Sequence, residues 1–421
     1  MTATAAPRTR LRDDRDFRRY WWSRVLSMGG SMVTLVALPV LVYRLSGSTF
    51  LTALVSALEA VPYLAFGLLS GALSDRWDRR GMMVGADLVA AGLMGSVPVA
   101  YWLGLLTVPH VLVVAFAAPA ATVFFDGANF GALPVLVGRD RIAEANAAVW
   151  GAATVVEMVT PAAVGIALAV VSPATLIAVD ALSFAASAFF VRAITRLLQD
   201  PDRLRARFTK GAMRRDIREG LVFLVRHPGV RTMTMIGTLQ CMAGGGFVAL
   251  NVIWCDRVLG IGTSGLEFGL VFSAWGVGGI IATTALPRLL RRTSAARIAL
   301  GALPVSAVIG IATPFAHWWV LAALGVFGWS VAYMLFAVNS ISYRQQVTPE
   351  HLLGRVNTAG RMLAWGLGWT SGAFLGGALA SLVEVQHAMS AMAALALVGC
   401  VVAWTSPLRS ASSVEVLASS Q

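Results

Sequence analysis

Long runs of apolar residues, separated by short polar links, occupy most of the chain. Each run is long enough to cross a bilayer as a helix, since about 20 residues at a rise of 1.5 Å span the hydrocarbon core. The runs are continuous and lack the short alternating segments of a membrane β-barrel. We therefore predict an all-α integral membrane protein with twelve transmembrane helices, at 20–43, 50–73, 82–105, 109–137, 146–171, 173–194, 230–258, 265–289, 295–315, 318–341, 356–383 and 388–403.

One long polar segment, 195–228, divides these spans into two sets of six. Its later part keeps Met213, Ile217 and Leu221 at helical spacing among charged residues. This pattern predicts an amphipathic helix on the inner membrane face. The expected parts are an arm (1–19), an N-terminal half (20–194), a linker (195–228), a C-terminal half (229–408) and a tail (409–421).

Composition and charge support this interpretation. Hydrophobic residues make up 57% of the chain and charged residues 13%, whereas a soluble domain has about 25% charged residues. The net charge of +12 does not indicate nucleic-acid binding, because all Lys and Arg except Arg44 and Arg257 lie in the termini, the linker and alternate links. By the positive-inside rule, we expect both termini in the cytoplasm.

Several enzyme and pump classes are excluded by missing motifs. The single lysine, Lys210, precedes a glycine, so no phosphate loop of the form G-x-x-x-x-G-K-[ST] exists. HExxH and G-x-S-x-G motifs are absent, and the three cysteines lack zinc-ligand spacing. We therefore expect no enzyme activity, no metal site, no ATP site and no cofactor.

The link between the second and third spans, 71–80 (GALSDRWDRR), is unusually charged. It resembles the signature loop of the major facilitator superfamily, G-x-L-[SA]-D-R-x-G-R-[RK], although Asp78 stands where that family often has Gly. The stretches FFDGANFGALPVLV and LLGRVNTAGRMLAWG resemble its bacterial branch of enterobactin-exporter and macrolide-efflux type. The residues that match the loop are Gly71, Leu73, Ser74, Asp75, Arg76, Arg79 and Arg80.

The resemblance implies two pseudo-symmetric six-helix halves in the bacterial inner membrane. It implies a monomer that exchanges protons for a small organic molecule, such as a drug, an antibiotic, a siderophore or another secondary metabolite, by alternating access. The expected partners are therefore the substrate, protons and membrane lipids. A proton-coupled importer with the same fold is the alternative.

The signature loop is expected to act as a gate. Asp75 could cap the start of the eleventh span, and the loop arginines could pair with carboxylates between the fourth and fifth spans, forming a latch that holds the outward-facing state. The alternative is that the arginines only set topology. The residues assigned to the gate are Gly71, Asp75, Arg76, Arg79, Arg80, Asp140 and Glu144.

Four carboxylates fall inside predicted spans, where a charge costs at least a few kcal/mol, so each suggests a function. Burial favours the protonated form of a carboxyl group and allows it to gain and lose a proton during a cycle. Asp126 and Glu157 are the first choices for proton and substrate coupling, followed by Glu59. Asp180 lies nearer the outer end and could reach headgroups. Structural hydrogen bonds are the alternative for each.

Three further charged residues are expected to have ordinary roles. Asp87 is two turns from Arg80, which predicts an ion pair, and Arg24 and Arg361 are expected to extend toward the inner surface.

Other polar residues in spans 1, 4, 7 and 10 could line a central cavity, with interhelical hydrogen bonds as the alternative. Gly368, Gly372 and Gly376, at four-residue spacing, predict a close-packing face. The possible cavity residues are Ser27, Ser31, Asn129, Gln240, Asn251, Tyr333 and Asn339.

Overall fold

The computed structural model describes residues 11–74, 77–138, 141–199, 210–349 and 352–406, and the regular elements within these ranges are all helices. The first six spans are α1 (Arg15–Ser46), α2 (Thr49–Ser74), α3 (Arg79–Trp102), α4 (Val108–Val137), α5 (Ile142–Ala167) and α6 (Pro173–Arg192). After α7 (Lys210–Arg226) come α8 (Pro228–Arg257), α9 (Leu266–Leu290), α10 (Ala295–Ala312), α11 (Trp319–Val347), α12 (Leu353–Arg361), η5 (Met362–Trp369), α13 (Thr370–Leu379), α14 (Val385–Ala393) and α15 (Leu395–Thr405).

The predicted eleventh span is one helix with an internal irregularity. Among the described residues, 11 stretches are long and apolar enough to cross a membrane, with α14 and α15 together forming the last. The twelfth consists of α12, the π-helical segment η5 and α13, which follow one another without a break. The predicted all-α fold with twelve transmembrane helices is thus confirmed.

The glycines of this span allow α13 and η5 to lie against α8. A Cβ on Gly368 would lie 2.6 Å from the Thr238 carbonyl oxygen, and one on Gly372 would overlap the Met242 carbonyl. The predicted close-packing face is therefore confirmed, because only a residue without a side chain fits at these contacts.

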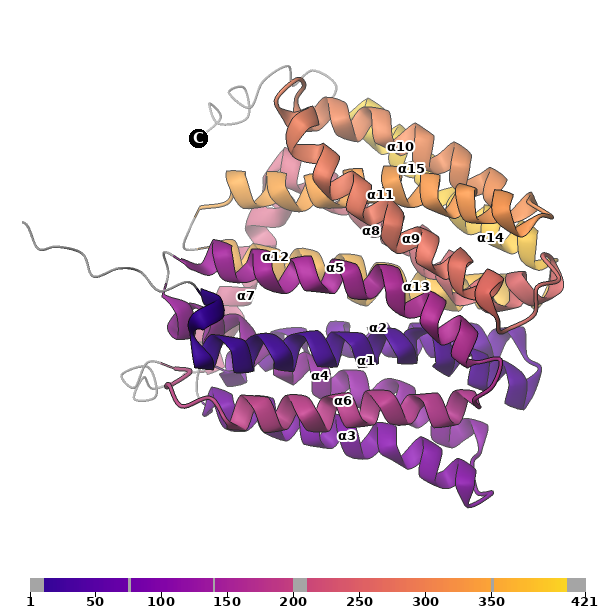
Figure 1. The fold of residues 1–421 in the computed structure, drawn as a ribbon. Coiled ribbons are helices and arrows are strands. Elements are labelled where there is room, and N and C mark those ends of the chain that lie inside the picture. The colour runs from indigo at the N-terminus through magenta and orange to yellow at the C-terminus, as the bar shows by residue number, and fades with distance from the viewer. Residues whose placement is uncertain (1–10, 75–76, 139–140, 200–209, 350–351, 407–421) are drawn as a thin grey trace, which may run out of the picture.

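The helices form two groups, α1–α6 and α8–α15, drawn from indigo to magenta and from orange to yellow in Figure 1. Between them in sequence, α7 crosses one end of the bundle (Figure 1). We call this the α7 end, and the other the opposite end. The apolar Leu224 of α7 is buried in a cluster with Val230 and Val356, and Glu219 lies 2.5 Å from Arg355. The amphipathic linker helix thus packs on the C-terminal group.

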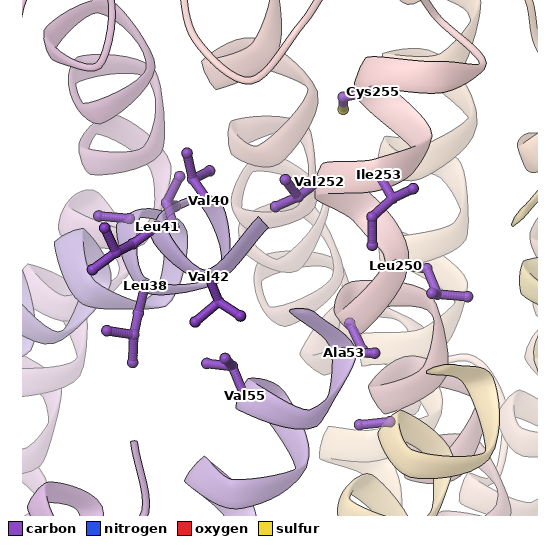
Figure 2. Close-up of a cluster of buried hydrophobic side chains, with 14 of the residues drawn as sticks. Leu38, Val40, Leu41, Val42, Ala53, Val55, Leu250, Val252, Ile253 and Cys255 are labelled. Carbon is purple, nitrogen blue, oxygen red and sulfur yellow. The ribbon is translucent and has the colours of Figure 1, made fainter. Parts of the chain in front are cut away.

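The hydrophobic core is arranged differently at the two ends. Toward the opposite end, one cluster joins both groups, as the side chains of α1, α2 and α8 in Figure 2 show. Toward the α7 end there are two clusters, one within each group. Among the buried residues that the structure describes, the two groups therefore share a core cluster only toward the opposite end.

Backbone and polar contacts join the two groups at the opposite end as well. The Gly265 amide donates to the Gly165 carbonyl oxygen at 2.6 Å, and the Tyr43 hydroxyl donates to Asp256 at 2.7 Å. A Cβ on Gly269 of α9 would lie 2.7 Å from the Pro161 carbonyl oxygen of α5. From this contact, α5 and α9 diverge toward the α7 end (Figure 1). The structure is closed at the opposite end.

Candidate functional site

The centre of the site is a carboxylate that faces two arginines. Arg24 Nη1 on α1 lies 3.7 Å from Asp126 Oδ1 on α4. Arg361 Nη2, at the end of α12, lies 3.5 Å from Asp126 Oδ2, and the Tyr63 hydroxyl of α2 donates to the same oxygen at 3.5 Å. Since Arg361 belongs to the C-terminal group, this ion pair connects the two halves deep inside the bundle.

Aromatic rings support both guanidinium groups. Arg361 lies 5.2 Å from the ring centroid of Tyr63 and 5.7 Å from that of Phe130, and Arg24 lies 5.2 Å from that of Phe125. Such cation–π contacts partly replace hydration of a cation removed from water.

The expectation that Arg24 and Arg361 extend to the membrane surface is wrong, because both turn toward Asp126. An opposite charge within 4 Å in a poorly hydrated interior attracts more strongly than one in water. The Asp126 side chain is 16% exposed and that of Arg361 is 44% exposed. With one carboxylate and two guanidiniums, the cluster carries a net charge of +1 when Asp126 is ionised and +2 when it is protonated.

Of the other three predicted intramembrane carboxylates, only Asp180 is fixed by hydrogen bonds. It is 1% exposed, and it accepts from the Thr34 hydroxyl of α1 at 2.5 Å and from Ser183 at 3.1 Å. Asp180 therefore faces α1 rather than lipid headgroups, which corrects that expectation. Glu59 of α2 is half-buried and lies within electrostatic range of Asp180.

Glu157 lies where the two halves meet. Its carbonyl oxygen would be 2.7 Å from a Cβ on Gly276 of α9, and its side chain is exposed. The structure thus brings Asp126 to the centre of the site and places Glu157 in the interface between α5 and α9. Asp180 and Glu59 lie in the N-terminal half.

The predicted ion pair between Asp87 and Arg80 is not formed. Arg80 donates to the Arg196 carbonyl oxygen at 2.5 Å. Asp87 is 2% exposed and lies near Ser187 of α6. It therefore faces the interior of the N-terminal half and not the α7 end.

The described part of the signature loop binds its own half. Arg79 is 4% exposed and donates to the carbonyl oxygens of Ser74 and Gly131, at 3.2 and 2.8 Å. A Cβ on Gly71 would meet nothing within 4 Å. These contacts fix the ends of α2, α3 and α4 relative to one another.

The predicted partner of the loop arginines, Glu144, instead lies 3.2 Å from Arg141, one turn away. Glu144 pairs with Arg141 because residues three apart on a helix are neighbours. Asp75, Arg76 and Asp140 lie outside the described residues, so the remaining gate assignments stay predictions.

Most of the predicted cavity residues take part in interhelical or local hydrogen bonds. Gln240 donates to Ser306 at 3.3 Å, Asn339 donates to the Ala295 carbonyl oxygen at 2.7 Å, and the Tyr333 hydroxyl donates to Cys241 at 3.4 Å. Asn129 accepts from Tyr20 and Asn251 from Cys255, while Ser27 is buried and Ser31 half-buried. The alternative of interhelical hydrogen bonds thus describes Asn129, Gln240, Tyr333 and Asn339, whereas the Asn251 bond lies within α8; the cavity assignment stays a prediction.

An aromatic pair next to Arg361 was not predicted. The rings of Trp365 and Trp369 on η5 are stacked, with centroids 5.0 Å apart and planes at 10°. Tyr63, the hydroxyl partner of Asp126, was also missed. The spacing of Arg361, Trp365 and Trp369 by four residues is a sequence signal that could have identified one helix face.

Comparison with known proteins gives the family. The sequence matches the family described as "Transmembrane secretion effector" over residues 5–421. It is 26% identical to macrolide efflux protein A of Streptococcus pyogenes over 223 residues, which is 53% of this chain and only 54% of that relative, about half its length. It is also 26% identical to the enterobactin exporter EntS of Shigella boydii over 407 residues, 91% of this chain and 90% of the relative.

Solved structures share the fold. The nucleoside transporter NupG aligns with a TM-score of 0.74 at 11% identity, covering 92% of this chain and 98% of NupG. A bacterial homologue of the iron transporter ferroportin in an inward-facing state aligns with a TM-score of 0.70 at 16% identity, covering 92% of this chain and 98% of the homologue. The chain belongs to the Transmembrane secretion effector family of the major facilitator superfamily, and its described helices form a multi-pass bundle of membrane-spanning length.

Proposed function

We propose that this protein exports a small organic molecule in exchange for protons across a bacterial plasma membrane. The names of the relatives, an efflux protein and an exporter, support the direction. The concentration of Arg residues around α7 supports a cytoplasmic location for that end and for both termini. The described conformation, closed at the opposite end, is then inward-facing. We propose that the transporter works as a monomer among lipids and without a cofactor.

The observation that carries the proposal is the position of Asp126 between Arg24 and Arg361. Of these two arginines, Arg361 lies in the other half. Both guanidiniums lie within ion-pair distance of the carboxylate, at 3.7 and 3.5 Å. A proton that arrives at Asp126 cancels its attraction for Arg361 and so weakens a contact between the halves. A partly exposed ion pair contributes at most a few kcal/mol, yet 1.4 kcal/mol already changes a population ratio about tenfold.

This arrangement gives an order of events for export. In the inward-facing state, Asp126 is ionised and paired, and a substrate enters from the cytoplasm. After the halves move and the substrate leaves on the outside, a proton binds Asp126. The protonated transporter returns to the inward-facing state, where the proton leaves to the cytoplasm and Asp126 pairs with the arginines again. Coupling follows because proton and substrate bias the same contact between the halves.

The test uses inside-out membrane vesicles with an imposed acid-inside gradient and a pH-sensitive dye. Macrolides, siderophores and aromatic antibiotics are added singly. We expect one class to trigger proton release from the wild type, and Asp126→Asn to abolish it. Glu384→Gln is the matched control, because the Glu384 side chain is 72% exposed on a link.

Two results would overturn the proposal. Proton release by Asp126→Asn at the wild-type rate would remove Asp126 from the coupling step. Uptake of a compound by intact cells under an inward proton gradient, without release from the vesicles, would reverse the direction and identify an importer.

A further inference from the structure

A second polar cluster lies inside the N-terminal half, away from the contact between the halves. We call it the α6 polar track; it consists of Asp180, Ser183 and Ser187 on α6 and Asp87 on α3. Asp180, Ser183 and Ser187 are separated by three and four residues, so they follow one face of α6 for about 10 Å. All four side chains are at most 9% exposed.

Hydroxyl groups of α1 line the other side of the track. The Ser23 and Ser187 oxygens are 2.9 Å apart, and Thr34 donates to Asp180. Gly30 lies between them, and a Cβ on it would be 2.5 Å from Asp180 Oδ1. The absence of a side chain at Gly30 lets α1 approach the track closely.

Asp87 has an unusual place at one end of the track. Its carboxyl group lies near Ser187 of the track, and its Oδ2 atom is buried and has no hydrogen-bond partner among the described residues. Leaving a buried polar atom unpaired costs about 1–3 kcal/mol. Such atoms are rare in native proteins and call for a specific explanation.

The charged groups around Asp87 explain how it differs from Asp126. Arg24 of α1, Asp126 of α4 and Asp180 of α6 lie within electrostatic range of it. His110 of α4 lies further toward the opposite end, where its Nε2 is hydrogen-bonded to the Ser96 hydroxyl of α3 at 2.8 Å. Arg24 is paired with Asp126, and no arginine in the described part of the chain forms an ion pair with Asp87. An unpaired buried carboxylate is costly and neutralises by taking up a proton.

We propose that Asp87 is a second proton-carrying residue, which exchanges a proton with the Asp126 site from its buried position beside Ser187 in the N-terminal half. Each transfer moves one proton from a carboxylic acid to a carboxylate or to water, and no other bond changes. Asp87 contacts neither Arg361 nor the interface between the halves. It therefore carries protons without occupying the position at which a substrate meets Asp126.

This inference rests on the proposed proton coupling, and the experiment separates the two. The full-length protein in proteoliposomes is assayed with the compound that triggers proton release in the vesicle test. Two readouts are taken, the number of protons moved per substrate and substrate–substrate exchange, which requires no net proton movement. For Asp87→Asn we expect the number of protons per substrate to fall by one and exchange to stay within about twofold of wild type.

Matched variants distinguish a proton carrier from a structural residue. Asp87→Glu should restore the wild-type ratio. Ser96→Ala removes a polar group from the same helix, α3, and should leave both readouts unchanged. If Asp87→Asn does not fold, Ser187→Ala retains the carboxyl group and should shift the pH at which net transport is half-maximal.

Three outcomes would overturn the inference. The first is an unchanged proton ratio in Asp87→Asn. The second is an equal loss of exchange and net transport, which indicates a structural role. The third is a wild-type pH profile in Ser187→Ala when Asp87→Asn does not fold. If the wild type itself moves no protons, the proposed function fails and this inference fails with it. If Asp126→Asn loses proton coupling but Asp87→Asn keeps it, the proposed function stands and only the role of Asp87 is refuted.

Discussion

A close backbone approach between the halves, at Gly269, gives the sharpest prediction. In Gly269→Ala, the new Cβ would lie 2.7 Å from the Ala162 Cα atom, 2.7 Å from the Pro161 carbonyl oxygen and 2.9 Å from the Ala162 carbonyl oxygen. All three are backbone atoms of α5, which cannot rotate away as a side chain can. Ordinary contact begins at 3.4 Å, so α5 and α9 must separate by about 0.7 Å at this point.

The free-energy cost of Gly269→Ala depends on the hydrogen bonds that this separation of α5 and α9 disturbs. The Gly265–Gly165 hydrogen bond of 2.6 Å and the bond from the Ala162 amide to Ser273 at 3.0 Å lie along the same contact. Overpacking of a well-packed contact costs about 1–3 kcal/mol. The substitution acts on the state that is closed at the opposite end. At 1.4 kcal/mol per tenfold, it should shift the population away from that state by about 5- to 150-fold.

Distances between spin labels measure this shift. Labels are placed at exposed positions in opposite-end links of the two halves, Leu105 and Leu382, after the three native cysteines have been replaced. Gly279→Ala is the control on the same helix, because its Cβ would meet only the Met334 side chain, at 3.8 Å. We expect longer label distances for Gly269→Ala only. A distribution identical to that of the control would refute the reasoning.

Three further predictions concern other contacts. Arg361→Gln removes the cross-half partner of Asp126 and should lower proton-coupled transport at least tenfold while leaving the melting temperature nearly unchanged; an unaltered transport rate would contradict this. Gly372→Ala should lower the melting temperature in detergent by several degrees, because its Cβ would overlap the Met242 carbonyl. His227 caps α8 through Nδ1, and burial lowers the pKa of its imidazole below the usual 6.5. Because the unfolded chain then binds more protons than the folded one, the stability of the protein should fall as the pH drops below about 6.5. His227→Asn keeps a capping side chain and should remove this pH dependence in thermal melts.

The residues at which helices begin depend on capping contacts, which a hydropathy pattern does not reveal. The first span was predicted from residue 20, but α1 begins at Arg15 because Asp14 caps it, accepting from the Asp16 and Phe17 amides. Asp16 then accepts from the Thr195 hydroxyl at 2.7 Å, which ties the start of α1 to the segment after α6. A charged first turn lowers the hydropathy of the window, although it stabilises the helix N-terminus.

The irregular eleventh span shows a second limit. Its range was predicted as continuous, and the glycine spacing identified the face that packs on α8. The sequence carried no sign of the π-helical turn, which accommodates the stacked rings of Trp365 and Trp369. π-Helical turns occur frequently at functional sites, and this one directly follows Arg361.

The sequence by itself determined the twelve spans, the division into halves and the family. It could do so because a bilayer requires about 20 apolar residues per helix with the backbone hydrogen bonds satisfied locally, so each span is encoded in its own residues. Only the tertiary structure decided that Asp126 meets Arg361, that Asp87 turns away from Arg80, and that the halves touch at Gly165 and Gly269. These partners are brought together by the packing of helix faces distant in sequence, and no local pattern specifies which faces meet.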